Sequence, residues 1–210
     1  MGVPVGSEAL TRARKEEIVN ACAALYKTMG FREITLDAIG KRTSFTRTSI
    51  YNYFHTKEEI FLALLQREHE AWIADMQEIF AGPALPSGAF AEAFAHALEG
   101  RGCMLKLMSM NLYELEGNSR MENLVAFKRV YAQAMQTIAQ GLAKFFPQMG
   151  KSGVDAFLYA FFPFLFGIYP YTAATGKQRA AMDLAGMRYT PRTVFEITRA
   201  LVEKLLPAQG

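Results

Sequence analysis

Residues 46–57, TRTSIYNYFHTK, carry many hydrogen-bonding side chains and very little apolar surface. Only Ile50 and Phe54 are plainly apolar, and their spacing of four places them on one face of a helix. The first turn of this helix would hold three hydroxyl groups and one arginine. Hydroxyl, guanidinium and ammonium groups are the donors that proteins direct at phosphate oxygens and base edges. The stretch therefore predicts a nucleic-acid contact.

The preceding residues predict the elements that would position this helix. Residues 11–29 form a helical pattern with one apolar face (Ile18, Cys22, Leu25, Met29), and Gly30 suits its C-terminus. Thr35 is a good N-cap for a second helix, and Asp37 lies in its first turn. Thr46 can cap a third helix that runs to about Phe54. Two short helices joined by a turn, after a longer support helix, describe a helix-turn-helix.

In such a unit the second short helix lies in the DNA major groove. Ile50 and Phe54 would anchor it to the protein. Arg47 would bond a guanine edge, and the Thr48 methyl would contact a thymine. Tyrosine hydroxyls, a lysine and the backbone amides at the start of the second helix would reach phosphates. The predicted DNA-binding residues are Thr35, Thr46, Arg47, Thr48, Ser49, Tyr51, Asn52, Tyr53 and Lys57.

Charge and cysteine content favour the same class. Residues 1–57 carry nine Lys and Arg against five Asp and Glu, a net +4, whereas residues 58–210 carry 14 against 15. Excess positive charge at one end favours a polyanion contact there. Cys22 and Cys103 form no CxxC pair and have no metal-ligand neighbours, and the N-terminus lacks the pattern of a signal peptide. We expect a cytoplasmic protein with no metal, no cofactor and no enzymatic activity.

Residues 34–61, ITLDAIGKRTSFTRTSIYNYFHTKEEIF, resemble the N-terminal domain of the tetracycline-repressor (TetR) family of bacterial regulators. The resemblance covers about residues 11–62. Three positions depart from the family pattern: Gly40 stands where alanine is common, Ser44 replaces the usual turn glycine, and Thr46 replaces serine. Because a left-handed backbone is unfavourable for serine, we expect a cost at Ser44. The matching positions are Thr35, Leu36, Ile39, Ile50, Tyr51, Tyr53, Phe54, Lys57, Glu58 and Ile60.

The helical patterns continue to the C-terminus, so the sequence predicts an all-α chain of about nine helices. A capping box at Thr56–Glu59 opens a long helix to about Phe80. A threonine-proline pair at Thr190 and Pro191 predicts a last helix ending before Pro207. We expect an N-terminal arm and three-helix helix-turn-helix DNA-binding domain in residues 1–56. Residues 57–210 would form a larger helical domain for ligand binding and dimerisation.

The segment 154–174, VDAFLYAFFPFLFGIYPYTAA, is long and apolar enough for a membrane span, but Pro163, Gly167 and Pro170 interrupt it. A helix that is apolar on all sides is otherwise buried on all sides. The resemblance implies that this helix and the last helix form a homodimer interface, and we expect no membrane contact. The predicted interface residues are Phe157, Phe164, Leu165, Phe195, Thr198, Leu201 and Val202.

The same half of the chain is rich in methionine, which lines adaptable sites. A kink at Pro163 would open space beside its helix. We expect a largely apolar cavity for a small effector, although each lining residue could equally be ordinary core. The predicted effector-binding residues are Met104, Leu107, Met108, Asn111, Leu112, Phe127, Tyr131, Met135, Phe161 and Tyr169.

These features together predict a dimeric, ligand-responsive transcriptional regulator. Repression is the favoured sign, with release from a palindromic DNA operator when a small apolar effector binds. Two alternatives remain from the sequence. One is an all-α small-molecule-binding protein or enzyme, and the other is a DNA-binding regulator without an effector.

Overall fold

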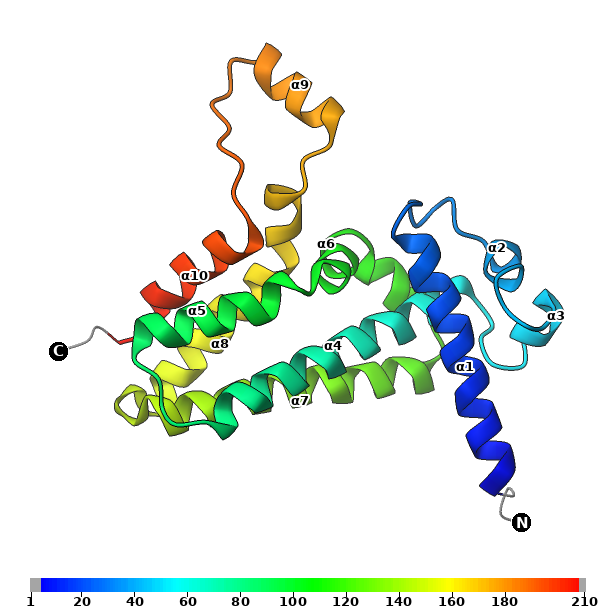
Figure 1. Cartoon of the computed structure of the whole chain (residues 1–210), viewed down its shortest axis with the longest axis horizontal. Helices are drawn as coiled ribbons and strands as arrows, with labels where there is room; N and C mark the ends of the chain where they lie inside the picture. The colour runs from blue at the N-terminus through cyan, green and yellow to red at the C-terminus, as the bar shows by residue number, and fades with distance from the viewer. Residues whose placement is uncertain (1–4, 208–210) are drawn as a thin grey trace. The chain divides into compact units, whose positions relative to one another are not determined.

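The computed structural model describes residues 5–207, and within them all regular secondary structure is helical, with no strand (Figure 1). The all-α prediction is confirmed, with one more helix than expected. The helices are α1 (Val5–Tyr26), α2 (Leu36–Gly40), α3 (Arg47–Ile50), α4 (Lys57–Ala81), α5 (Ser87–Glu99), α6 (Gly102–Gly117), α7 (Met121–Phe145), η1 (a 3-10 helix, Pro147–Met149), α8 (Gly150–Thr172), α9 (Gly176–Leu184) and α10 (Val194–Leu205).

The chain divides into two compact units. The first consists of residues 1–67 and 111–129, and the second of residues 68–110 and 130–210. The boundary falls inside α4, α6 and α7, so each of these helices contributes residues to both units.

The first unit is built on α1, with α2 packed against both α1 and α3. The predicted apolar face is largely confirmed: Ile18, Cys22 and Leu25 are buried. The helix begins at Val5 and not at Thr11 as predicted; residues 1–4 lie outside the described range. The prediction missed the start of the helix because residues 8–10 are exposed and add nothing to the apolar face.

The core of the second unit is mainly aromatic. Trp72, the only tryptophan of the chain, is wholly buried, with its ring centroid 6.2 Å from that of Phe161 and 6.3 Å from that of Phe94. Phe94 and Phe161 meet edge to face at 5.0 Å. Aromatic rings in such arrangements gain stabilisation beyond the apolar area that they bury. The helix α10 packs against both α5 and α8.

The end of the chain differs from the prediction. The last helix begins at Val194 with Thr193 as N-cap, and not at Pro191 with Thr190. The Thr193 hydroxyl accepts a hydrogen bond from the Glu196 N–H at 3.1 Å, and the Glu196 carboxylate accepts one from the Thr193 N–H at 2.8 Å. This reciprocal capping box outweighs the threonine-proline pair. The sequence analysis did not predict α9.

Candidate nucleic-acid interface

The start of α2 follows the prediction. Thr35 has an extended backbone, and its hydroxyl accepts a hydrogen bond from the Ala38 N–H at 3.1 Å. Asp37 lies in the first turn, where the positive end of the helix dipole stabilises a carboxylate. Thr35 is therefore the N-cap of α2, as its residue type indicated.

The next helix, α3, is shorter than predicted, at four residues from Arg47 to Ile50. Turns continue to Phe54, where the Phe54 N–H bonds the Ile50 carbonyl at 3.0 Å. Thr46 is the N-cap residue, but its hydroxyl makes no capping bond and instead lies 3.2 Å from the Ser49 hydroxyl. Ile50 is wholly buried and Phe54 nearly so, which confirms them as the anchors of this segment.

The turn between α2 and α3 does not have the expected left-handed serine. Among the described residues, only glycines have a positive φ, so Ser44 carries no such strain. Instead, the Glu17 carboxylate of α1 accepts hydrogen bonds from the Ser44 N–H and, at 3.1 Å, from its hydroxyl. The expected cost is therefore wrong, because a carboxylate distant in sequence holds the turn in an ordinary conformation. The role of Glu17 was not predicted from the sequence.

Close packing between α2 and α3 explains the glycine at position 40. A Cβ atom placed on it would lie 3.3 Å from the backbone N and Cα of Arg47, tighter than an ordinary contact. The end of α2 and the start of α3 thus approach closely, and an alanine would press on the backbone of α3. This accounts for glycine at a position where the family commonly has alanine.

Most of the predicted DNA-binding residues lie at the surface of the first unit. The exposed ones are Thr35, Thr46, Arg47, Thr48, Tyr51 and Asn52, and Ser49, Tyr53 and Lys57 are half-buried. The Arg47 guanidinium donates to the Tyr51 hydroxyl at 3.2 Å and lies 5.9 Å from the centre of its ring. The Tyr53 ring is tilted against Phe45, with centroids 6.3 Å apart.

An open cleft of about 640 Å³ brings three of these residues together. Thr35, Arg47 and Lys57 all line it, although they come from three different elements. The Lys57 ammonium donates to the Phe31 carbonyl at 3.0 Å and lies 4.3 Å from the centre of the Phe31 ring. The lining also includes the carboxylates of Asp37 and Glu58, so cationic donors and acids alternate around this opening. Tyr51, Tyr53 and the rest of the predicted set lie outside the cleft lining.

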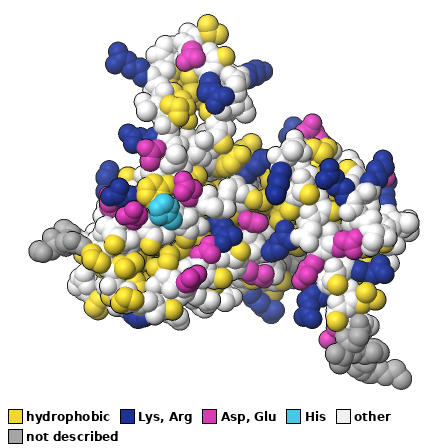
Figure 2. All heavy atoms as spheres, in the orientation of Figure 1, with side chains coloured by type: hydrophobic (Ala, Val, Ile, Leu, Met, Phe, Trp, Pro, Cys, Tyr) yellow, Lys and Arg dark blue, Asp and Glu magenta, His cyan; other side chains and the backbone are white. Residues whose placement is uncertain are grey.

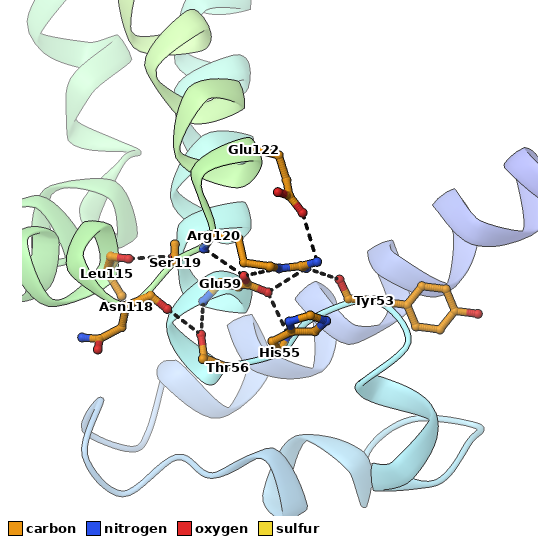
Figure 3. Close-up of polar contacts among 9 residues, drawn as sticks. All are labelled: Tyr53, His55, Thr56, Glu59, Leu115, Asn118, Ser119, Arg120 and Glu122. Carbon is orange, nitrogen blue, oxygen red and sulfur yellow. Dashed lines mark hydrogen bonds and ion pairs between the residues drawn. The ribbon is translucent and has the colours of Figure 1, made fainter.

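A buried carboxylate at the start of α4 was not predicted as a functional group. Glu59 is the last residue of the predicted capping box, and its N–H bonds the Thr56 hydroxyl at 3.2 Å. Its carboxylate accepts hydrogen bonds from the Arg120 Nε at 2.6 Å and from the His55 N–H at 2.7 Å. In Figure 3, Arg120 reaches across to Glu59 from the start of α7. Arg120 also bonds the Tyr53 carbonyl at 3.4 Å.

This network joins the loop between α6 and α7 to the end of the helix-turn-helix. The Thr56 hydroxyl, beside Glu59, donates to the Asn118 carbonyl at 3.1 Å (Figure 3). Burial alone would raise the pKa of the Glu59 carboxyl, but hydrogen bonds from Arg120 and from the His55 N–H lower it to about 2. Glu59 is therefore ionised at neutral pH and holds both neighbouring backbone segments. Only a Thr-x-x-Glu pattern hinted at it in the sequence.

The predicted effector-binding residues divide between the units. Asn111, Leu112 and Phe127 belong to the first unit, where the Asn111 side chain accepts a hydrogen bond from Tyr26 at 3.4 Å. The other seven belong to the second unit: Met104, Leu107, Met108, Tyr131, Met135, Phe161 and Tyr169. Of these, Met104, Leu107, Met108 and Phe161 are buried.

The two tyrosines predicted to bind the effector, Tyr131 and Tyr169, both lie in the second unit. Tyr131 contacts Phe162 with ring centroids 5.3 Å apart. Burial, and secondarily the Cys103 thiol, raises the pKa of the Tyr169 hydroxyl. Tyr169 is therefore a neutral hydrogen-bond donor at physiological pH.

Four of the predicted dimer residues are buried within the single chain: Phe157, Leu165, Thr198 and Val202. Phe164, Phe195 and Leu201 are partly exposed. The helix α8 has a second face that remains open, with Tyr159 79% and Tyr171 68% exposed. The stretch Pro147–Thr172 is the one described helical segment long and apolar enough to cross a membrane, by length and composition alone.

Comparisons with known proteins agree with this architecture. Residues 18–64 match the model of the family "Bacterial regulatory proteins, tetR family", and residues 66–206 match "Tetracyclin repressor-like, C-terminal domain". A comparison with curated protein sequences finds no match.

Several solved structures share the fold at low sequence identity. The regulator PfmR from Thermus thermophilus is 17% identical with a TM-score of 0.60, over 90% of this chain and 96% of that one. MbdR from Azoarcus sp. CIB is 20% identical with a TM-score of 0.56, over 92% and 97%. FadR from Bacillus subtilis, in complex with stearoyl-CoA, is 14% identical with a TM-score of 0.58, over 91% and 97%.

Proposed function

The chain belongs to the TetR family of transcriptional regulators, and on that premise we propose that it is a ligand-responsive repressor of the bacterial cytoplasm. In this proposal two copies bind a palindromic DNA operator, and a small, largely apolar effector releases them. Paired heads would contact half-sites about one helical turn apart, roughly 34–36 Å.

The observation that carries the DNA-binding part is the composition of the outer surface of α3. Ile50 and Phe54 are buried, whereas Arg47, Thr48 and Asn52 of the same segment are exposed. Such a helix is anchored by two buried apolar side chains and exposes hydrogen-bond donors on its remaining surface. This arrangement is suited to binding an anionic or polar partner. We propose that Arg47 bonds a guanine edge and that Lys57 and Thr35 contact phosphate from the cleft that they share.

For the effector, we propose a site in the second unit beside Trp72. The Trp72 indole N–H is buried and has no acceptor among the described residues. An unpartnered buried donor is rare and calls for an explanation. An effector that brings a carbonyl or carboxylate oxygen would satisfy the N–H, while the surrounding rings of Phe94, Phe161 and Phe162 hold an apolar body. FadR binds stearoyl-CoA, so long-chain acyl compounds are the first candidates.

For the homodimer, we propose that the open face of α8 meets its counterpart in a second copy. Tyr159, Pro163, Gly167 and Tyr171 are exposed and recur on one side of the helix. Partly exposed Leu201 and Phe195 on α10 extend the apolar surface. Since large exposed apolar faces are uncommon in monomers, a second copy is the fitting cover. The residues buried within one chain, such as Phe157 and Val202, would support the interface from behind.

Release of DNA requires that the effector favour one arrangement of the heads over another. We propose that the Glu59–Arg120 pair transmits this preference to the recognition segment. Arg120 and Asn118 lie between α6 and α7, and they bond the Tyr53 carbonyl and the Thr56 hydroxyl directly after α3. A shift of that loop would therefore move the backbone that holds the end of the recognition segment.

Shift assays with genomic fragments from beside its own gene would test the DNA-binding role, at two salt concentrations and with and without acyl compounds. We expect a retarded band that weakens with salt and disappears with an effector. Failure to retard any fragment would refute the regulator. A retarded band that no compound affects would favour the alternative of a regulator without an effector.

Effector binding can be followed separately, because Trp72 is the only tryptophan and is wholly buried. We expect acyl compounds to change its fluorescence in a saturable way. The variant Phe161→Leu changes one ring of the site and should weaken this saturable response. Fluorescence unchanged by every ligand that releases DNA would contradict the Trp72 site.

A further inference from the structure

Between α8 and α10 the chain makes an excursion, residues 173–193, which we call the arm (Figure 1, orange). Its helix α9 has no buried residue in the described chain. Leu184 is 91% and Met187 55% exposed. At its base, the Tyr189 hydroxyl donates to the Tyr171 carbonyl at 2.6 Å, which ties the arm to the end of α8.

The sequence nevertheless contains a capping motif at each end of α9. Thr175 and Gln178 form a reciprocal capping box at the N-terminus. Gly186, with φ +66°, ends the helix, and the Met187 N–H bonds the Met182 carbonyl at 2.9 Å. This pattern is a Schellman motif. Isolated helices shorter than about 12–15 residues are marginal in water, so a capped helix of nine residues gains its stability by packing against another surface.

The arm offers an apolar strip within a basic rim. Leu184, Ala181 and Ala185 share one side of α9 by their helical spacing. The arm holds four Lys and Arg (Lys177, Arg179, Arg188, Arg192) against one acid, Asp183, a net +3. In Figure 2, Lys and Arg side chains stand at the edges of the arm around a hydrophobic patch.

The same unit carries an acidic cleft that its own arm leaves open. The cleft lies between α4 and α5, measures about 340 Å³, and is lined by Asp75, Glu78, Ile79 and His96 among others. Of the four acids in residues 71–101, Asp75 and Glu78 line the cleft, together with the one base of that segment, Arg101. Glu78 is exposed, and Asp75 is bonded to Arg101.

We propose that the arm of one copy docks on the acidic cleft between α4 and α5 of a second copy. Leu184 and its alanine neighbours would cover the apolar wall formed by Ile79, Ala93 and Ala97, while an arm arginine meets Glu78, the acid of the lining that is not paired with Arg101. Opposite charges across an interface fix its register. The arm would thus add a second, reciprocal contact to the dimer, and this inference rests on the proposed homodimer.

A photo-crosslinking residue, benzoylphenylalanine, placed at Leu184 tests the contact directly. The position is almost fully exposed, so the substitution leaves the fold intact. Mixed dimers of ¹⁴N- and ¹⁵N-labelled chains separate intermolecular from intramolecular products by mass. We expect intermolecular crosslinks to peptides within residues 71–101, and low yield from the same probe at Asp183, which lies on another side of α9. Products within one chain, on DNA or elsewhere on the partner would overturn the inference.

Charge exchange provides a second test. We expect Arg188→Glu to weaken the dimer about tenfold in sedimentation equilibrium, and Glu78→Arg in the same chain to restore at least part of the loss. Arg188→Lys keeps the charge and is the control. A chain with residues 176–187 replaced by an equal length of glycine and serine separates the hypotheses. If that chain has the dimer dissociation constant of the natural chain, the proposed docking of the arm is refuted and the dimer itself stands. If the natural chain is a monomer, the proposed dimer is refuted as well.

Discussion

The interiors of the two units are stabilised by different kinds of interaction. In the first, short helices and turns are fixed by polar bonds to the backbone, such as those from Glu17 to Ser44 and from Glu59 to His55. In the second, a cluster of aromatic rings around Trp72 forms the core. Polar bonds are directional and depend on protonation, whereas apolar burial depends on volume and fit.

This difference matches the tasks proposed for the units. A recognition surface has to expose its donors, and in the first unit buried carboxylates such as Glu59 fix the turns beside it, in addition to an apolar core that includes Ile18 and Phe61. An effector site needs an apolar interior with few fixed polar groups. Changes in pH should therefore act mainly on the first unit, and changes in side-chain volume mainly on the second.

The largest effect is expected from Phe161→Ala in the aromatic cluster. Phe161 is wholly buried, and truncating a buried phenylalanine costs about 3–5 kcal/mol of unfolding free energy through lost transfer energy and a cavity. Urea unfolding followed by circular dichroism measures the change. Tyr159→Ala on the exposed side of α8 is the control and should cost much less in the monomer. Equal losses would contradict the assignment of Phe161 to the core.

The next effect concerns pH and Glu59. Its pKa is lowered from 4.5 to about 2 in the folded protein, so its contribution is present above pH 4.5 and is lost as the pH falls toward 2. The loss amounts to up to roughly 3 kcal/mol, because each pKa unit corresponds to about 1.4 kcal/mol. Unfolding free energies measured from pH 6 to pH 2.5 give the slope.

The neutral variant Glu59→Gln sharpens this comparison. We expect it to be less stable than the natural chain at pH 6 and to approach it at pH 2.5. Glu58→Gln, one position earlier on the same helix, serves as the control and should leave the pH slope unchanged. If the unfolding free energy of Glu59→Gln depends on pH as steeply as that of the natural chain, other carboxylates cause the acid sensitivity.

Arg47→Ala should weaken operator binding by about 1–3 kcal/mol and relax the preference at one base pair. The reason is the loss of a bidentate bond to a guanine edge. Fluorescence anisotropy on operator duplexes with single base changes measures it, and Arg129→Ala on the exposed side of α7 is the control. If the variant loses the same binding free energy on all duplexes, Arg47 contacts only phosphate and no base.

The smallest effect is expected from Lys57→Ala. A lost phosphate contact weakens binding to all sequences alike and reduces the slope of log K against log salt by about 1. Because Lys57 also bonds the Phe31 carbonyl, unfolding of the variant has to be measured alongside. A salt slope equal to that of the natural chain would assign Lys57 a purely structural role.

The sequence predicted local features well where one residue type determines the outcome. The Thr35 cap, the Ile50 and Phe54 anchors and the α4 start all follow from side chains adjacent in the chain. Features fixed by partners distant in sequence were missed: Glu17 at the Ser44 turn and Arg120 at Glu59 lie 27 and 61 residues away. The helix α9 was missed because it buries nothing in its own chain and shows a weak apolar pattern.

The central claim is that the segment beginning at Thr46 offers its outer surface to a duplex groove. Selection of binding sites from random duplexes tests it most directly, with the natural chain and Arg47→Ala selected in parallel. The account predicts that the natural chain enriches an inverted repeat, and that the variant loses one conserved base in each half-site. Failure of the natural chain to enrich any sequence, or identical motifs from both chains, would contradict it.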